Sequence, residues 1–154
     1  MYQILKLIHV AAVIIFLGNI ITGLFWKAHA DRTKDIRFIA HTMHGIIRSD
    51  RWFTIPGVIV ITLAGVLAAI QAGLPILRTG WIFWSLVAFS VSGIVFAWRV
   101  APLQKQILAL TTTTDGPFQW DLYRSKSLQW EVWGFVATVS PLIAVVLMVL
   151  KRPA

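Results

Sequence analysis

Four long apolar segments divide the chain, and charged residues are confined to the stretches outside them. The segments cover residues 7–26, 54–73, 81–98 and 132–150, and none contains Lys, Arg, Asp or Glu. A helix rises about 1.5 Å per residue, so roughly 20 apolar residues cross the ~30 Å hydrocarbon core of a bilayer. Inside lipid, only helices and closed barrels satisfy every backbone hydrogen bond. The pattern predicts an all-α fold, a bundle of four transmembrane helices over about 3–28, 54–73, 81–110 and 118–150, as a single integral membrane domain (1–154).

The first connection carries a second kind of pattern, an apolar stripe at helical spacing. It predicts an amphipathic interfacial helix over about 34–48, between the first two transmembrane helices, with Thr33 as its N-cap. We expect this helix to lie in the headgroup plane or to pack across the end of the bundle. The residues of the stripe are Ile36, Ile39, Ala40, Met43, Ile46 and Ile47.

The other two connections differ in length. Residues 74–80 form a short turn with Pro75 and Gly80 as helix breakers, so the second and third transmembrane helices are expected to be antiparallel neighbours. Residues 99–131 are long enough for a cytoplasmic helical hairpin between the third and fourth helices, with the run TTTTDGP (111–117) at its tip.

The distribution of Lys and Arg predicts the orientation. Of the 14 cations, ten lie in the two long connections and four lie at the termini and the short turn. Cytoplasmic loops carry the excess of Lys and Arg, so both termini are predicted to be periplasmic, in a bacterial inner (cytoplasmic) membrane. The ten are Lys27, Arg32, Lys34, Arg37, Arg48, Arg51, Arg99, Lys105, Arg124 and Lys126, and the four are Lys6, Arg78, Lys151 and Arg152.

Composition narrows the function classes. Charged residues make up 13% of the chain, about half the roughly 25% of soluble domains. The absence of Cys excludes disulfides, thiolate metal sites and Cys nucleophiles. No HExxH motif or phosphate-cradling Gly loop occurs, which argues against hydrolases. The net charge of +8 is spread between apolar segments, so membrane lipid is the expected partner rather than nucleic acid.

His9 is the leading candidate for chemistry, because it is the one His inside an apolar segment. An ionisable group within a membrane is costly and indicates a functional site. One helical stripe places Phe16 and Gly23 below it, an arrangement suited to a flat cofactor such as haem b, whose iron takes imidazole as axial ligand. Met148 is a candidate weak sixth ligand. The alternative is a His that hydrogen-bonds to a neighbouring helix. The predicted cofactor-binding residues are His9, Lys6, Phe16, Gly23 and His29, with His9 as the metal ligand.

Three further patterns have weaker functional implications. The polar face of the amphipathic helix predicts an anion or headgroup site rather than a zinc site, since its cations would repel a metal ion. Asp50 and Thr54 are interpreted as an N-cap and first-turn pair that opens the second span. The small residues Gly65, Ala69 and Gly73 predict close helix packing, including homo-oligomerisation. The anion-site residues are Arg37, His41, His44 and Arg48.

Several segments resemble a known family. KLIHV (6–10), the 18–23 region, WKAH (26–29) with Arg32, DRWFTIPG (50–57) and WEVWGF (130–135) are similar to bacterial predicted integral membrane proteins catalogued as a domain of unknown function. A more distant resemblance is to the four-helix, haem-binding protoporphyrinogen oxidase family, which begins with a Lys-x-x-His helix. That resemblance implies haem b, with Lys6, His9, Gly23 and His29 at the matching positions. Copper-resistance membrane proteins share similar first-helix patterns.

Three functional hypotheses follow. The first is a membrane oxidoreductase that binds haem b or a porphyrin through His9 and acts in redox or tetrapyrrole chemistry. The second is a non-catalytic membrane assembly or docking subunit. The third is a small transporter, against which the lack of charged residues in the later spans argues.

Overall fold

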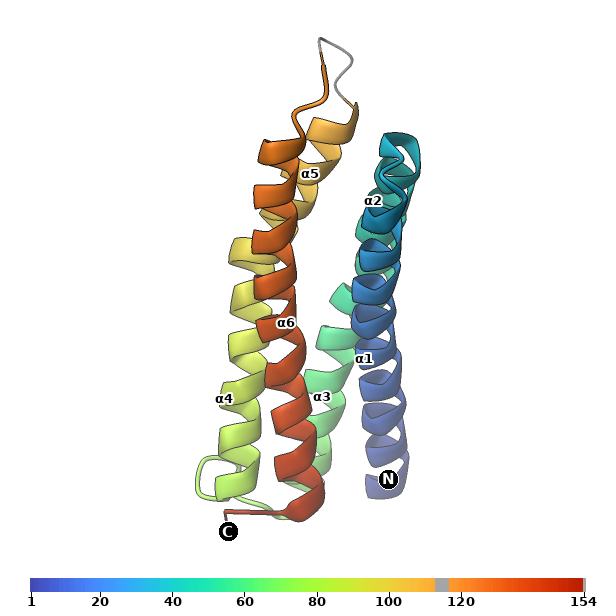
Figure 1. The fold of residues 1–154 in the computed structure, drawn as a ribbon. Helices are drawn as coiled ribbons and strands as arrows, with labels where there is room; N and C mark the ends of the chain where they lie inside the picture. The colour runs from blue at the N-terminus through green and yellow to red at the C-terminus, as the bar shows by residue number, and fades with distance from the viewer. Residues whose placement is uncertain (113–116, 154) are drawn as a thin grey trace.

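The chain forms a bundle of four long helices (Figure 1). The computed structural model describes residues 1–112 and 117–153, and every regular element in this part is helical. Four continuous helices are long and apolar enough to cross a membrane: Tyr2–Thr33, Ile36–Gln71, Gly80–Thr112 and Trp120–Leu150. The predicted all-α, four-helix architecture is confirmed. The elements are α1 (Tyr2–Thr33), α2 (Ile36–Ser49), η1 (Asp50–Thr54), α3 (Ile55–Gln71), α4 (Gly80–Val95), η2 (Phe96–Val100), α5 (Ala101–Thr112) and α6 (Trp120–Leu150).

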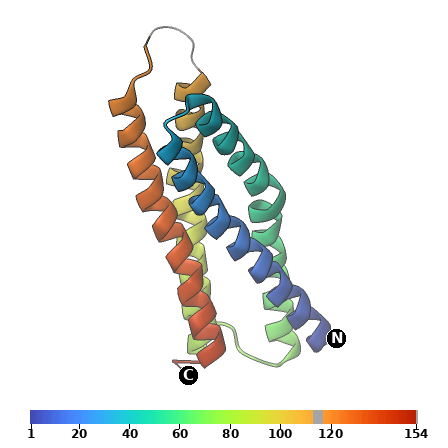
Figure 2. The ribbon, with the colours of Figure 1, turned by 45° about the vertical axis from the view of Figure 1, so that its right-hand side comes forward.

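The helices associate as two pairs. α1 packs along α3, and α4 packs along α6 (Figures 1 and 2). The second and third spans were expected to be neighbours because of their short connection, but α3 and α4 do not pack along each other, and their continuous helices meet instead where α2 contacts α5. Small residues and hydroxyls hold the second pair, as expected for helices in lipid. The Oγ of Ser92 donates to the carbonyl of Ala137 at 2.6 Å, and the Oγ of Ser85 lies 3.2 Å from the carbonyl of Ala144. The two pairs meet where α1 contacts α6 and α2 contacts α5.

Two of the long helices contain a π-helical turn. The N–H of Ile55 donates to the carbonyl of Asp50, and the N–H of Ala101 donates to that of Phe96. Each bond joins residues five apart, one more than in an α-helix. α2 therefore runs through η1 into α3, and α4 runs through η2 into α5, without a break in the helix.

Two predicted helix caps are wrong. The chain is already helical before Asp50, so Asp50 and Thr54 do not open the second span, and their side chains face the interior instead. Thr33 is not the N-cap of α2, because α1 extends to it and ends at Lys34 in a left-handed conformation. Asp35 is the cap, since its carboxylate accepts from the N–H groups of Arg37 and Phe38.

The amphipathic helix and the second hairpin are both present. α2 stands alongside α1 rather than across it, because it buries Ile39 and Met43 against Leu103 and Ile107 of α5 (Figures 1 and 2). α5 and the first turns of α6 form the hairpin, and most of its predicted tip falls on residues 113–116, outside the described residues.

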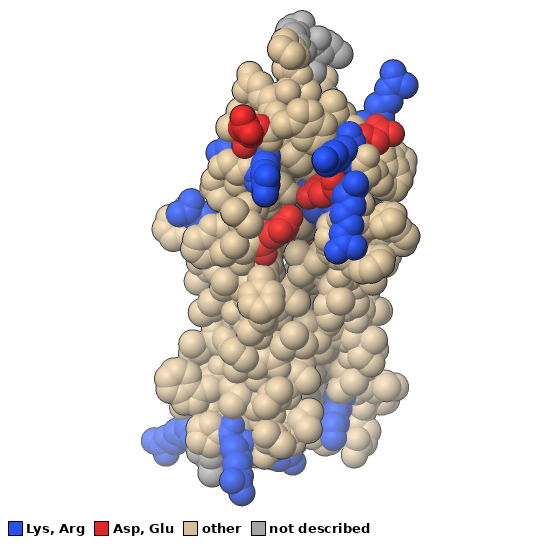
Figure 3. Space-filling model, viewed as in Figure 1, with Lys and Arg blue, Asp and Glu red and all other residues tan. Residues whose placement is uncertain are grey.

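Charge separates the two halves of the molecule. Figure 3 shows acidic and basic residues together over the half built from α2, α5 and the start of α6, above a broad uncharged surface. Both termini lie at the opposite end, where only Lys and Arg are seen (Figures 1 and 3). The uncharged surface is the one that a bilayer would cover.

Candidate functional site

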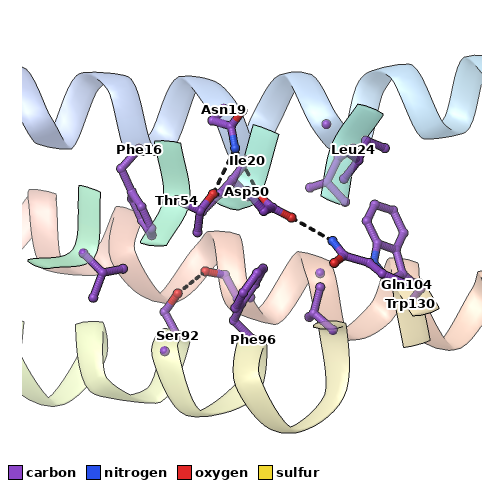
Figure 4. Close-up of a pocket in the computed structure, with 17 residues that line it drawn as sticks. Phe16, Asn19, Ile20, Leu24, Asp50, Thr54, Ser92, Phe96, Gln104 and Trp130 are labelled. Carbon is purple, nitrogen blue, oxygen red and sulfur yellow. Dashed lines mark hydrogen bonds between the residues drawn. The ribbon is translucent and has the colours of Figure 1, made fainter. Parts of the chain in front are cut away.

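A buried carboxylate lies at the junction of the two helix pairs. Asp50 is 7% exposed. Its Oδ1 accepts from the amide of Asn19 at 3.1 Å and the hydroxyl of Thr54 at 2.7 Å, and its Oδ2 accepts from the amide of Gln104 at 2.8 Å (Figure 4). All three donors are uncharged. Within the described part of the chain, no Lys, Arg or His forms an ion pair with Asp50.

The same carboxylate lines an interior cavity of about 50 Å³. This volume exceeds the roughly 10–15 Å³ that one water requires, so the cavity has room for a small guest. Trp130 lines it too and is 3% exposed, and its indole Nε1–H has no hydrogen-bond partner among the residues that the structure describes. The lining residues are Phe16, Asn19, Ile20, Gly23, Leu24, Ile46, Asp50, Thr54, Val58, Ser92, Gly93, Phe96, Val100, Gln104, Trp130, Gly134 and Ala137 (Figure 4).

Helical spacing explains how the sequence assembles this site. Asp50 follows buried Ile46 by four residues, so it continues the buried face of α2, and Thr54 follows after four more. On α1, Asn19 lies close to Phe16 on the face toward η1. The extension of the apolar stripe by a polar residue was a usable sequence signal, but SDRWFT was interpreted as the start of a new helix.

A second polar cluster ties α1 to α6. The Nζ of Lys27 is fully buried and lies 2.7 Å from Oδ1 of Asp31, 3.0 Å from the hydroxyl of Tyr123 and 2.8 Å from Oγ of Ser127. Tyr123 and Ser127 each donate to Asp31 as well. Lys27 also sits 5.8 Å from the ring of Trp130, so the cluster borders the cavity wall. This cation is neutralised by its own partner, unlike the carboxylate of Asp50.

A family model described as a predicted integral membrane protein (DUF2269) matches residues 3–152. The chain belongs to this family. Membership in DUF2269 and four membrane-crossing helices agree in making the chain an integral membrane protein. A search of curated proteins found no match, and a search of solved structures found none. The resemblance to the haem-binding oxidase therefore gains no support from these comparisons.

In this DUF2269 chain, His9 is held by the neighbouring helix. Its Nδ1 lies 2.9 Å from the carbonyl of Ile61, and its ring packs so closely on Gly65 that an added Cβ there would be 2.9 Å from two ring atoms. A carbonyl can only accept, so Nδ1 carries the proton in this hydrogen bond. His9 does not line the cavity.

The other predicted cofactor residues have separate surroundings. Phe16 packs on Gly57 and Phe89, and Gly23 faces the side chain of Ile46 on α2. Both line the cavity near Asp50, so the structure brings them to a site other than the predicted one. Lys6 is exposed, and His29 meets Trp26 and Phe38 edge to face. Met148 is half-buried on α6. No group of three metal-ligating side chains occurs among the residues with described positions.

The remaining predicted residues lie on two helix faces. Arg37, His41, His44 and Arg48 are all exposed on one face of α2, as expected from their spacing. The row of small residues predicted for helix packing lies on and after α3. The His9 ring of the same chain packs against Gly65, Ala69 is buried, and Gly73 follows α3 with a positive φ. Oligomerisation through this row stays a prediction.

Proposed function

We propose that this integral membrane protein binds a small, positively charged molecule inside the bundle, at Asp50. One observation supports the proposal: a carboxylate that lines a cavity is surrounded by uncharged donors alone. Burying a charge without a counter-charge costs several kcal/mol. Ionisable residues within transmembrane bundles often mark substrate or ion pathways. A cation in the cavity would supply the charge that the protein does not.

The walls of the cavity define the chemical class of the ligand. Phe16, Phe96 and Trp130 offer aromatic rings, which attract cations through their faces. The buried Nε1–H of Trp130, which no described residue accepts, needs an acceptor. A small ammonium ion that also carries a hydroxyl meets both demands, with the ammonium at Asp50 and the hydroxyl oxygen at Trp130. This proposal favours the transporter hypothesis over a docking subunit.

Ethanolammonium and propylammonium provide a matched pair of probes, because they share a charge and differ by a hydroxyl in place of a methyl. In detergent we expect ethanolammonium chloride to raise the thermal unfolding midpoint more than propylammonium chloride, with sodium chloride at equal concentration as reference. A ligand at 100 times its Kd stabilises by about 2.7 kcal/mol. Asp50→Asn should abolish both shifts, and Trp130→Phe should remove the difference between the two ions.

Asp121→Asn is the control, since it neutralises an exposed acid at the start of α6. It should leave both shifts unchanged. Stabilisation of the Asp50→Asn variant equal to that of the unmodified protein would refute the site, as would the absence of any shift above sodium chloride.

Haem b or a porphyrin bound through His9, in redox or tetrapyrrole chemistry, is the second candidate. One observation favours it: the Nδ1–H bond to the carbonyl of Ile61 leaves Nε2 free, and protein-bound metals commonly use a His oriented in this way. Against it, the ring packs on Gly65 and does not line the cavity.

An absorption spectrum distinguishes the two candidates. Haem at His9 predicts a Soret band in protein purified without added cofactor, lost in His9→Ala. Binding at Asp50 predicts a colourless protein, and this is the result that we expect. A Soret band that survives in the Asp50→Asn variant but not in His9→Ala would favour the haem candidate.

We also infer the location from charge. The excess of Lys and Arg in the two long connections favours the bacterial inner membrane with both termini in the periplasm. The test fuses to the C-terminus a reporter that is active only in the cytoplasm. Activity of this fusion would contradict the predicted orientation.

A further inference from the structure

A groove lies on the outer surface where α2 passes into η1. It has a volume of about 430 Å³ and is lined by Gly45, Arg48, Ser49, Trp52 and Phe53. Arg48, Trp52 and Phe53 are exposed. A Cβ atom added at Gly45 would have no described atom within 4 Å, so this position of the groove is open.

Helical spacing puts the groove at the end of a basic stripe. Arg48 and Ser49 follow Gly45 by three and four residues, so the three share a face. Arg37, His41 and His44 lie exposed on the same helix before it. Beyond it, Trp52 and Phe53 precede the apolar segment that begins at Thr54. The groove is therefore bordered by the guanidinium of Arg48 on one side and by exposed aromatic rings on the other.

We propose that this groove binds the headgroup of an anionic phospholipid. The guanidinium of Arg48 suits a phosphate, which it can contact through two N–H groups. Among the residues that the structure describes, no acid forms an ion pair with Arg48. Trp52 and Phe53 have the amphipathic or apolar character of residues at the membrane–water interface, where acyl chains begin. A free phosphate would use the cation but leave these rings uncovered.

The test measures lipid binding by native mass spectrometry of the full-length protein in detergent. Phosphatidylglycerol is titrated against phosphatidylcholine, and we expect phosphatidylglycerol to bind more tightly. Arg48→Gln should weaken it about fivefold, the factor that one basic residue contributes at an anionic surface. Gly45→Leu keeps every charge and occupies part of the groove, so it should weaken phosphatidylglycerol binding as well.

Two matched controls accompany these variants. Gly18→Leu adds the same side chain on α1, where an added Cβ has no described atom within 4 Å, and Arg78→Gln removes a cation from the short turn. Neither should change the affinity. Unchanged phosphatidylglycerol binding by the Gly45→Leu variant would overturn the proposal that the groove binds the headgroup. The affinity would then come only from general attraction between charges. Displacement of the lipid by excess inorganic phosphate would overturn its assignment to a lipid.

Discussion

Lys27→Met is expected to lower the free energy of unfolding by about 3 kcal/mol, the low end for breaking a buried ion pair from one side. Met preserves most of the volume but removes a donor shared by Asp31, Tyr123 and Ser127. Lys27 is fully buried, whereas Asp31 is 22% exposed, so water will partly solvate the carboxylate left behind. Unfolding by sodium dodecyl sulfate in mixed micelles, followed by circular dichroism, measures the change.

Lys6→Met makes the same replacement at an exposed position of α1 and should be nearly neutral. The double variant Lys27→Met, Asp31→Asn no longer contains the unpaired carboxylate. Its free energy of unfolding should therefore fall by less than the sum of the decreases in the two single variants. Equal stability of the Lys27→Met and Lys6→Met variants would show that the cluster contributes nothing to folding.

Gly65→Ala is expected to destabilise the protein by about 1–3 kcal/mol, the usual cost of overpacking. The new Cβ would lie 2.9 Å from two atoms of the His9 ring. The ring cannot move away without giving up its hydrogen bond to the carbonyl of Ile61. Helix propensity alone predicts that Gly65→Ala stabilises the helix by up to about 1 kcal/mol. The predicted decrease in the free energy of unfolding therefore depends on the contact between the new Cβ and the His9 ring. The same mixed-micelle titration provides the measurement.

Gly18→Ala is the matched substitution, because nothing lies within 4 Å of its added Cβ, and it should be neutral or stabilising. His9→Ala removes the ring, so Gly65→Ala on that background should cost much less than on the unmodified protein. A loss of the same size on both backgrounds would place its cause elsewhere than in the His9 contact.

The four membrane helices were predictable because lipid imposes a length and makes charged side chains costly, and both constraints are visible in a single apolar segment. The apolar stripe likewise predicted α2. Its continuity with α3 was not predictable, because Ser49, Asp50 and Pro56 are residue types that commonly start a helix. A π-helical turn is defined by its backbone hydrogen bonds, and the hydropathy pattern of the side chains does not predict it.

The site was harder to predict than the fold because its partners are remote in sequence. Asp50 is bonded by Asn19 and Gln104, which lie 31 and 54 residues away. Lys27 was counted as a loop cation, and nothing local distinguishes a buried Lys from an interfacial one. His9 is recognisable from the sequence as costly to bury, but the carbonyl that accepts its hydrogen bond belongs to the backbone of another helix.

The two π-helical turns each accommodate one residue more than an α-helix without rotating the two halves of the helix against each other. In each turn an N–H bonds to the carbonyl five residues back, so a five-residue step covers nearly the rotation of a four-residue step in an α-helix. Both turns contribute to the cavity wall, through Asp50 and Thr54 in η1 and through Phe96 and Val100 in η2. A one-residue deletion in either turn would therefore restore α-helical hydrogen bonding and keep the phase of the flanking segments, and its cost would fall on the cavity wall. The same deletion in a regular part of these helices would rotate every residue beyond it by about 100°.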